Sequence, residues 1–540
     1  MLENYEEFSE EQVKILERFV TNTKGSVFVL RNLPEVIKGA LFSRYSRSTL
    51  GLRSLLLKEF ILNEDTAFQA IAGKLDVQDH QMTAVQKAQS FYDRILDGYG
   101  DDSIGELGGA HLAIENISML AAKAIEDCRI GGSPLEKSTR YIYFDQKVNG
   151  EYLFHRESVL MTSAYRDLYV ETCNSLFEAY GKLIPPLTAL IEEGFPKDPA
   201  ISKGAYTAAL RAKVLDCLRG LLPASALTNM GVYGNGRFFE MLLQKLECHP
   251  LAEMQELGKT AYQELSKVIP SFIRRGEPSH KHHQAFVQFL ENMQRDIREF
   301  AHHHTEQIEA MREPGARLTG FDANAPTKVA GAILFSSTHA SLANLQEYCK
   351  TLSEEDLARI LETGCSSREN RRHKSPRALE HANFTFEILA DFGCYRDLHR
   401  HRMLTQERQL LTCNFGYYIP KEILNTDMEE IYREAMEKAK KAFDTIAEEL
   451  PEEAQYVVPM GYNVHWYFHV NLRALQWMCE LRSQAAGHPT YRELAQKMAD
   501  EVSRAIPQFE RFFKFVDFEG YELGRLGAEV RQELKLQDKM

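Results

Sequence analysis

Two stretches of this 540-residue chain carry the same features in the same order, and this internal repeat constrains the fold more than any other feature. The stretches are DDSIGELGGAHLAIENISMLAAKAIEDCRIGGSPLEKSTRY at 101–141 and HKSPRALEHANFTFEILADFGCYRDLHRHRMLTQERQLLT at 373–412. Each passes from a serine-containing turn, through a glutamate, into a predicted strand, a helix and a basic loop. Self-similarity of this kind indicates a duplicated structural unit.

A second pair of segments follows downstream, because GNGRFFEMLLQKL and VNLRALQWMCELR both place Asn-x-Arg at a predicted helix start. Arg129 corresponds to Arg402 at a shift of 273 residues, and Asn235 to Asn471 at a shift of 236. The first half therefore carries 37 extra residues between its two motifs. Loop closure costs little more for a longer connection, so two tandem copies remain the simplest account.

Each half shows helical periodicity with a few short strand-like runs. Long patterns with apolar residues at i, i+3, i+4 and i+7 predict helices, as in MEEIYREAMEKAKKAFDTIAEEL. The runs GSVFVLRNL near 25, RYIYFD at 140 and HANFTFEIL at 381 are typical of short strands. We expect a mixed α/β protein with two tandem copies of one domain, each a small sheet flanked by long helices. The expected parts are residues 1–270, a linker at 271–324, and residues 325–540.

Composition limits the possible partners. The net charge of −13 argues against a dedicated nucleic-acid binder, although a few local arginines can still bind a phosphate. No apolar stretch is long enough to span a membrane and no secretory signal opens the chain, so we expect a cytoplasmic protein. The nine cysteines contain no CxxC pair and are expected to be reduced.

The junction between the halves contains two histidine clusters, at 280–283 and 302–304. A metal site is one interpretation, and a solvated linker or helix face is the other. Adjacent histidines on a helix point in different directions, so no chelating pair is evident and no metal is expected.

Two polar strings are candidates for the chemistry. Arg400-His401-Arg402 forms a dense basic point, and arginine forks bind phosphate with fixed geometry. In the other half Glu136, Ser138 and Arg140 would share one side of an extended loop. Each string also has an ordinary interpretation, as a solvated basic cluster or as the polar face of a strand.

Together these strings resemble the flavin-dependent thymidylate synthases. That family is marked by an Arg-His-Arg triplet, a following Glu-x-Ser-x-Arg-Tyr loop, an upstream His-x-Ser/Thr…Glu-His segment, and an Asn-x-Arg helix start with a later arginine. The resemblance covers roughly 30–150 with 220–265, and roughly 325–510.

The two halves retain complementary parts of this pattern. The first half keeps Glu136-x-Ser138-x-Arg140-Tyr141 but has Asp127-Cys128-Arg129 at the triplet and Leu246 at the position of the helix arginine. The second half keeps the triplet but has Leu410 where the loop serine belongs. It also retains the other family positions, which are His373, Ser375, Glu380, Asn471, Arg473 and Arg482.

The resemblance implies reductive methylation of dUMP to dTMP with FAD, NADPH and 5,10-methylenetetrahydrofolate. It implies that Ser138 and Arg482 are catalytic. The implied nucleotide-binding residues are Glu136, Ser138, Arg140, Tyr141 and Arg482. The implied flavin-binding residues are His373, Ser375, Glu380, Arg400, His401, Arg402, Asn471, Arg473, Asn235 and Arg237.

Family members look like homotetramers with sites at subunit interfaces, so we expect two chains to form a pseudo-tetramer with sites composed from both halves. We expect no nucleic-acid or membrane partner. Two alternatives stay open: a flavoenzyme acting on another pyrimidine nucleotide, and a non-catalytic duplicate that binds nucleotide or flavin. A role for Arg44–Arg47 is also left open.

Overall fold

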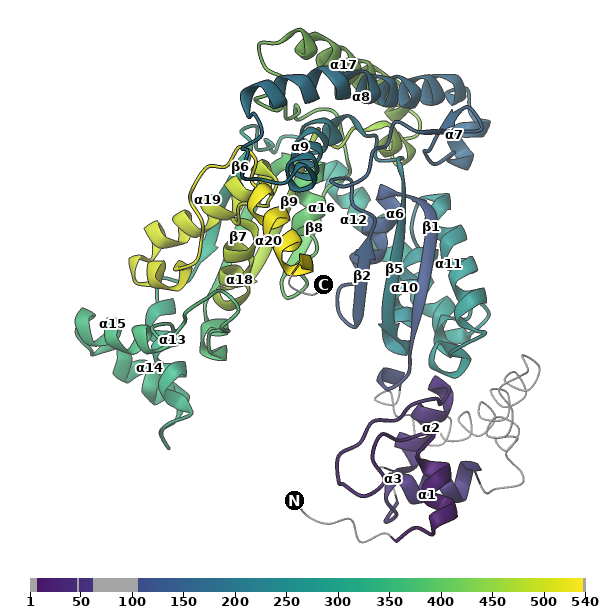
Figure 1. Cartoon of the computed structure of the whole chain (residues 1–540), viewed down its shortest axis with the longest axis vertical. Helices are drawn as coiled ribbons and strands as arrows, with labels where there is room; N and C mark the ends of the chain where they lie inside the picture. The colour runs from purple at the N-terminus through teal and green to yellow at the C-terminus, as the bar shows by residue number, and fades with distance from the viewer. Residues whose placement is uncertain (1–6, 46–47, 62–104, 538–540) are drawn as a thin grey trace. The chain divides into compact units, whose positions relative to one another are not determined.

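The computed structural model describes residues 7–45, 48–61 and 105–537 (Figure 1). The segment Asp101–Ser103 of the repeat, together with Ser46 and Arg47, lies outside the described residues. The chain divides into two compact units, which are described separately below. Unit 1 comprises residues 1–116, 124–136 and 229–307, and unit 2 comprises 117–123, 137–228 and 308–540.

Unit 1 contains a three-stranded sheet in the order β1-β5-β2. In it β2 pairs antiparallel with β5, from Gly132 opposite Gly234 to Glu136 opposite Met230. The strands and long helices of this unit, including those that cross its boundary, are β1 (Gly109–Ser118), α6 (Met119–Glu126), β2 (Gly132–Glu136), β5 (Leu227–Asn235), α10 (Gly236–Glu247), α11 (Ala252–Leu265) and α12 (Lys281–His304). Its amino-terminal helices are α1 (Glu10–Leu16), α2 (Glu35–Tyr45) and α3 (Leu52–Leu55), followed by a π-helical turn (Leu56–Ile61).

Unit 2 contains a four-stranded antiparallel sheet in the order β6-β7-β9-β8. The central pair runs from Asn383 opposite Asn471 to Asp391 opposite Asn463. Its strands are β6 (Gly315–Phe321), β7 (Asn383–Asp391), β8 (Thr405–Arg408) and β9 (Asn463–Asn471), with a separate hairpin of β3 (Lys147–Val148) and β4 (Glu151–Tyr152). Its helices are α7 (Ser158–Thr162), α8 (Arg166–Gly194), α9 (Lys203–Leu218), α13 (Ala325–Phe335), α14 (Leu342–Lys350), α15 (Glu354–Thr363), α16 (Phe392–Leu398), α17 (Asp427–Ala447), α18 (Leu472–Arg482), α19 (Pro489–Ala505) and α20 (Leu526–Gln537).

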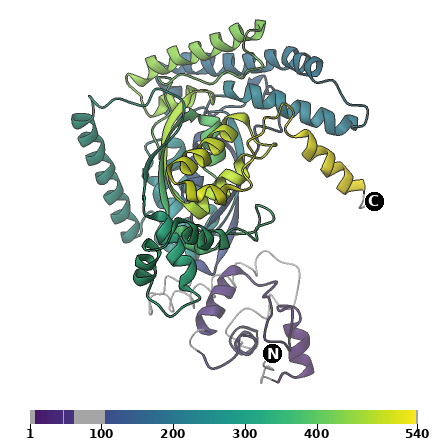
Figure 2. The same cartoon turned by 90° about the vertical axis from the view of Figure 1, so that its left-hand side faces the viewer.

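Helices cover the sheet of unit 2 and pair with one another. The alternation predicted for HANFTFEIL is confirmed, because Phe384, Phe386 and Ile388 of β7 are each fully buried. Helix α19 packs against β6 and β7, and α17 runs alongside α8 (Figure 1, Figure 2). Burying one face of the sheet under helices is the arrangement expected for an amphipathic strand pattern.

The two sheets repeat one topology, as the sequence predicted. The order β1-β5-β2 corresponds to β7-β9-β8, and a helix follows the equivalent strands in each copy. The copies differ between the last two motifs. The chain passes through α7, α8 and α9 between β2 and β5, whereas α17 is the long helix between β8 and β9. The 37 extra residues inferred from the sequence therefore fall among helices of unit 2.

Two local expectations are wrong, and the junction contains a helix. GSVFVLRNL contributes an isolated bridge between Val20 and Leu30 instead of a strand. RYIYFD contains no strand and begins with a turn, in which the backbone N–H of Tyr141 donates to the carbonyl oxygen of Ser138 at 3.5 Å. The turn-rich junction contains the 24-residue helix α12. Its amphipathic sequence outweighs the charged and turn-forming residues that flank it. The division at 271–324 stays a prediction about the two copies, since the compact units follow a different partition.

Candidate functional site

A cavity of about 530 Å³ opens within unit 2, beside the start of β7 and the start of α18. Its walls come from the segment before β7, the loop after α16, and the first turns of α18. The lining residues are Arg368, Arg371, His373, Lys374, Ser375, Glu380, Arg400, His401, Arg402, Met403, Leu404, Asn471, Arg473, Ala474, Gln476 and Trp477.

This cavity brings together every residue of the second half that was predicted to bind the flavin. They are His373, Ser375, Glu380, Arg400, His401, Arg402, Asn471 and Arg473. They lie up to 100 positions apart in the sequence and converge because β7 and β9 are adjacent antiparallel strands. The roles of these residues stay predictions, but their common location is a structural fact.

The cavity is cationic in an otherwise acidic chain. Six lining residues are arginine or lysine, and Glu380 is the one carboxylate among the described lining residues. Glu380 pairs with Nη1 of Arg473 at 2.7 Å, and Nε of Arg473 donates to the carbonyl oxygen of Ser375 at 2.9 Å. Guanidinium groups in such numbers suit a ligand that bears phosphates.

One buried hydroxyl in the wall has no protein partner. The Ser375 side chain is 3% exposed, and its Oγ makes no hydrogen bond with any part of the chain that the structure describes. Buried polar atoms in native proteins are nearly always satisfied, so an orphaned hydroxyl in a cavity wall indicates a place for a ligand atom. The cavity thus fits a polar, phosphate-bearing cofactor such as FAD.

Several lining residues were not anticipated from the sequence. Trp477 lies on α18 at 38% exposure, and Cζ of Arg371 sits 5.6 Å from the centroid of its ring. Lys374 and Met403 also line the cavity. The cations at 371–374 adjoin the His-x-Ser segment and could have been noticed, whereas no sequence signal distinguishes Trp477 from a core aromatic residue.

The middle residue of the basic triplet is an acceptor and not a cation. Nε of Arg482 donates to Nε2 of His401 at 2.8 Å. Burial, with a further contribution from Arg482, holds the pKa of His401 well below its ordinary value. The basic point predicted at 400–402 therefore has a neutral imidazole at its centre, because desolvation and a neighbouring guanidinium lower the pKa of His401.

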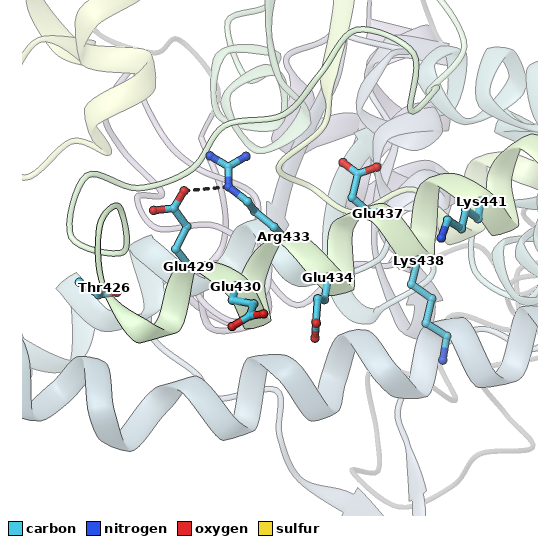
Figure 3. A pocket seen from close by; sticks show the side chains of 8 residues that line it. All are labelled: Thr426, Glu429, Glu430, Arg433, Glu434, Glu437, Lys438 and Lys441. Atoms are coloured by element: carbon cyan, nitrogen blue, oxygen red, sulfur yellow. Dashed lines mark hydrogen bonds and ion pairs between the residues drawn. The ribbon is translucent and has the colours of Figure 1, made fainter.

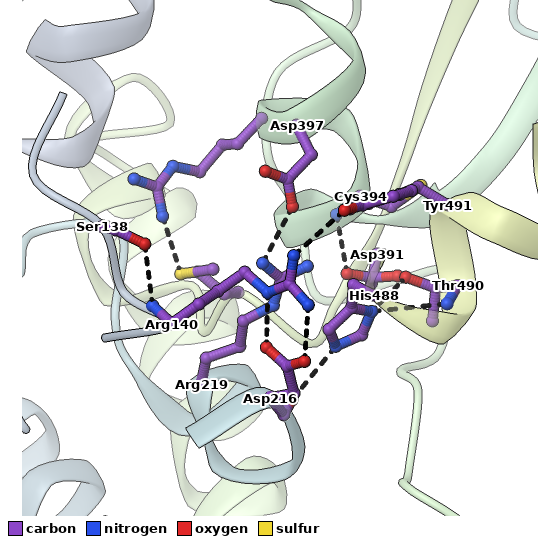
Figure 4. Close-up of polar contacts among 12 residues, drawn as sticks. Ser138, Arg140, Asp216, Arg219, Asp391, Cys394, Asp397, His488, Thr490 and Tyr491 are labelled. Carbon is purple, nitrogen blue, oxygen red and sulfur yellow. Dashed lines mark hydrogen bonds and ion pairs between the residues drawn. The ribbon is translucent and has the colours of Figure 1, made fainter. Parts of the chain in front are cut away.

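Arg140, from the loop of the first half, lies in the same unit as Arg482 and contacts Tyr491 (Figure 4), a residue that Arg482 also contacts. Its Nη1 donates to the hydroxyl of Tyr491 at 3.0 Å. The two guanidinium carbons of Arg140 and Arg482 lie 5.8 and 5.5 Å from the centroid of the Tyr491 ring. Motifs from the two halves of the sequence therefore meet around Tyr491.

Arg140 is also held by a carboxylate that the sequence did not reveal. Its Nε and Nη2 donate to the two carboxylate oxygens of Asp216 on α9, at 2.5 and 2.6 Å (Figure 4). Arg140 is 6% exposed and Asp216 is 9% exposed. A phosphate contact by Arg140 remains a prediction, and it would have to share a guanidinium that already forms a bidentate ion pair.

The other residues of the loop do not form an extended strip. Ser138 Oγ accepts a hydrogen bond from the backbone N–H of Arg140 at 3.2 Å, which is a turn contact. The Tyr141 ring is 51% exposed and has Cζ of Arg525 4.2 Å from its centroid. Glu136 ends β2 and the chain turns at Ser138–Tyr141, so the extended loop expected for Glu136, Ser138 and Arg140 is wrong. Turn formation after β2 breaks the two-residue alternation.

A neutral histidine completes the buried polar group around Arg140 and Asp216 (Figure 4). Nδ1 of His488 accepts from the backbone N–H of Thr490, so its proton is on Nε2, which donates to the carbonyl oxygen of Asp216 at 3.1 Å. Burial, reinforced by Arg219, lowers the pKa of His488 to about 3. Burial alone would raise the pKa of the Asp216 carboxyl, but Arg140 outweighs it and holds that pKa below its ordinary value.

This histidine predicts a specific acid sensitivity. The folded pKa of about 3 lies below the ordinary value of 6.5, so unfolding takes up a proton and stability falls as the pH drops through this window. We expect His488→Gln to reduce the slope of unfolding free energy against pH between 6.5 and 4.5 by up to about 1.4 kcal/mol per pH unit. Urea unfolding over that range measures the slope. His339→Gln, at an exposed site in the same unit, is the control, and equal slopes for both variants would reject this account.

The first copy retains a weakened version of these contacts within unit 1. Asn235 caps α10 as Asn471 caps α18, each accepting from the backbone N–H three residues later at 2.9 Å. Arg237 pairs with Glu106 at 2.7 Å, the same distance as Arg473 and Glu380. In the first copy Leu246 and Cys128 stand at the positions of Arg482 and His401, and their chain neighbours Lys245 and Asp127 form an exposed pair at 3.4 Å.

Two further features carry no chemistry. A hollow along α17 is lined by interspersed acidic and basic side chains, such as the paired Glu429 and Arg433, which is typical of a solvated helix face (Figure 3). Among the described residues no group of three histidine, cysteine or acidic side chains could hold a metal, including the junction histidines. In the same residues no helix is long and apolar enough to cross a membrane.

Comparison with known proteins places these observations in a family. The profile of the family described as "Thymidylate synthase complementing protein" matches residues 61–271 and 322–508. A UPF0159 protein of Chlamydia muridarum is 55% identical over 99% of this chain and 100% of its own length. A UPF0159 protein of Thermoplasma acidophilum is 32% identical over 92% of this chain and 99% of its own. A flavin-dependent thymidylate synthase of Clostridium tetani is 30% identical over 32% of this chain and 76% of its own.

Proposed function

Because the chain belongs to the thymidylate synthase complementing protein family, the flavin-dependent thymidylate synthases, we propose that it converts dUMP to dTMP. In this reaction 5,10-methylenetetrahydrofolate gives its methylene group to C5 of the uracil, and NADPH supplies the reducing hydride. When bound, FAD would serve as the hydride carrier between NADPH and the nucleotide. The observation that carries the proposal is the cationic cavity, which gathers eight family positions and an orphaned Ser375 hydroxyl.

The residues of the cavity would hold FAD by its phosphates and by one aromatic contact. The wall carries the cations of Arg371, Lys374, Arg400 and Arg402. The Ser375 hydroxyl has no hydrogen-bond partner in the described protein and can donate to a ligand oxygen. Trp477 offers a half-exposed ring face. These groups bind and orient, which is what the protein contributes when a cofactor carries the redox chemistry.

Arg482 would polarise the nucleotide. Its guanidinium reaches both the triplet, through His401, and the Tyr491 ring that also contacts Arg140. Placed against the uracil amide, it would stabilise negative charge at N3 and make C5 more nucleophilic. Neutral His401 fixes the orientation of Arg482 by accepting its Nε–H, so no proton transfer to this imidazole is required.

Tryptophan fluorescence gives a direct test of cofactor binding, since the chain has two tryptophans and they differ in position. Trp466 is 3% exposed in β9, whereas Trp477 lines the cavity. We expect FAD to quench the emission of wild type and of Trp466→Phe, and to leave that of Trp477→Phe nearly unchanged. Saturation is expected at one FAD per chain, because the first copy has Asp127 and Cys128 in place of the first two triplet residues.

Two outcomes would contradict the proposal. Quenching that persists in Trp477→Phe would place the flavin elsewhere, and saturation at two FAD per chain would reject the division of motifs between the halves. Oxidation of NADPH that depends on dUMP and methylenetetrahydrofolate tests the reaction itself. Oxidation supported by a different pyrimidine nucleotide would favour the alternative substrate, and FAD binding without turnover would favour a non-catalytic duplicate.

A further inference from the structure

Helix α12 carries an apolar seam that the described residues of unit 1 leave uncovered. Phe289 is 57% exposed, Ile297 is 60% and Phe300 is 66%, and Phe286 and Met293 are each above one-third. The helix has 24 residues and is roughly 36 Å long. It lies between the two segments that match the family profile, so it is an addition of this chain to the family domain.

The seam has the spacing of a coiled coil. Phe286, Leu290, Met293, Ile297 and Phe300 follow one another at intervals of four and three residues, and His304 continues the pattern. Alternating steps of four and three average 3.5 residues and keep one stripe facing a partner helix. A groove of about 660 Å³ runs along the same face, between Phe289 and Thr305.

The first turn of α12 is anchored to α10 and to Cys248, so the helix that carries the seam is held in place at its amino-terminal end. Nε2 of His283 lies 2.6 Å from a carboxylate oxygen of Glu247 on α10, and the His283 side chain is 1% exposed. Sγ of Cys248 also contacts the carbonyl oxygen of Val287 at 3.9 Å. All these residues belong to unit 1, so the anchoring is internal to that unit.

The exposed area matches what a protein interface requires. At roughly 200 Å² for a large apolar side chain, the seam residues Phe286, Met293, Ile297 and Phe300 together expose roughly 400 Å². That is near the apolar share of a standard interface, which buries about 800 Å² on each partner with about 60% of it non-polar. An area of this size lies within the roughly 300–600 Å² of the largest apolar patch on a typical monomer, and such patches are often functional.

The charges of α12 favour a protein partner over a membrane. The helix carries three basic residues, Lys281, Arg295 and Arg298, and three acidic ones, Glu291, Asp296 and Glu299. Helices that lie on anionic membranes have polar faces rich in lysine and arginine. A helix with balanced charge also meets no net repulsion from an identical helix.

We propose that α12 pairs antiparallel with the α12 of a second copy of this chain. The seam needs a partner seam of equal length, and a second copy supplies one. In the antiparallel register Met293 meets Ile297 of the other copy, Leu290 meets Phe300, and Phe286 meets His304. The two-fold axis then passes beside residue 295. Gln294 therefore lies next to Gln294 of the second chain, whereas Phe286 lies far from Phe286 of the second chain.

Single cysteines at these two positions test the pairing in the full-length protein. The nine native cysteines are all buried, so background cross-linking is low. Under mild oxidation we expect Gln294→Cys to form a covalent dimer at least tenfold faster than Phe286→Cys, its matched control. Adding Ile297→Lys to Gln294→Cys is expected to abolish that cross-link, and circular dichroism checks that the fold is retained.

Each other outcome overturns the pairing. Equally slow cross-linking at both positions rejects contact between copies, and faster cross-linking at 286 rejects the antiparallel register. Flotation with vesicles of mixed phosphatidylcholine and phosphatidylserine, lost in Ile297→Lys and without cross-linking at 294, would assign the seam to a lipid surface instead. None of these results depends on the proposed reaction, so they succeed or fail independently of it.

Discussion

Replacing Arg482 with alanine is expected to lower the rate of the proposed dTMP formation by roughly 10²–10³-fold while FAD stays bound. The expected size is that of losing one preorganised donor to a developing negative charge. FAD should stay bound because Arg482 is not among the residues that line the cavity, although it contacts His401, which is. The measurements are the turnover of dUMP and, separately, the FAD dissociation constant from Trp477 quenching.

Two further variants sharpen this result. Arg482→Lys keeps the charge but loses the planar fork and the Nε–H that His401 accepts, so we expect it to recover only part of the lost activity. Arg504→Ala removes an exposed arginine of α19 that pairs with Asp500, and it should behave as wild type. Wild-type turnover in Arg482→Ala would reject a role for Arg482 in polarising the nucleotide. Loss of FAD binding in this variant would show that Arg482 acts by holding the cofactor.

Replacing Asp216 with asparagine is expected to lower the free energy of unfolding of unit 2 by about 3–5 kcal/mol. The substitution leaves the Arg140 guanidinium buried without its carboxylate, and an uncompensated buried charge is among the costliest single changes. Because the pKa of Asp216 is lowered in the fold, its contribution is present at neutral pH and is lost as the pH falls below the ordinary carboxyl range. Urea unfolding near pH 7 therefore measures the full effect.

A surface pair provides the matched control. Asp444→Asn breaks the exposed pair between Asp444 and Lys440, and should cost at most about 1 kcal/mol. The double change Asp216→Leu with Arg140→Met should be less damaging than Asp216→Asn alone, because it removes both charges from the interior. Equal unfolding midpoints for Asp216→Asn and Asp444→Asn would show that Arg140 does not depend on Asp216.

The sequence predicted the features that depend on local order. The alternation in β7 and the Asn-x-Arg starts of α10 and α18 are local patterns with local physical causes. The repeat predicted the shared topology of the two sheets because duplicated segments fold alike. The same order of motifs correctly indicated the family.

The features that escaped prediction are pairings between distant positions. Asp216 lies 76 residues from Arg140, on a helix of the extra segment of the first copy, and nothing in its local sequence indicates a partner. The neutral state of His401 follows from burial and Arg482, neither of which the triplet itself reveals. The turn at Ser138 replaced an extended loop because an alternating polar string does not specify backbone conformation.

The contacts of Arg140 and Arg482 with Tyr491 affect how the protein behaves on dilution and when two variant chains are mixed. Both arginines belong to one polypeptide and one compact unit, so their proximity is set by covalent connection and not by mass action between subunits. That contact should survive at nanomolar protein concentrations. For the same reason, a chain damaged at Arg140 cannot be rescued at this contact by mixing it with a chain damaged at Arg482, since neither contributes an intact pair.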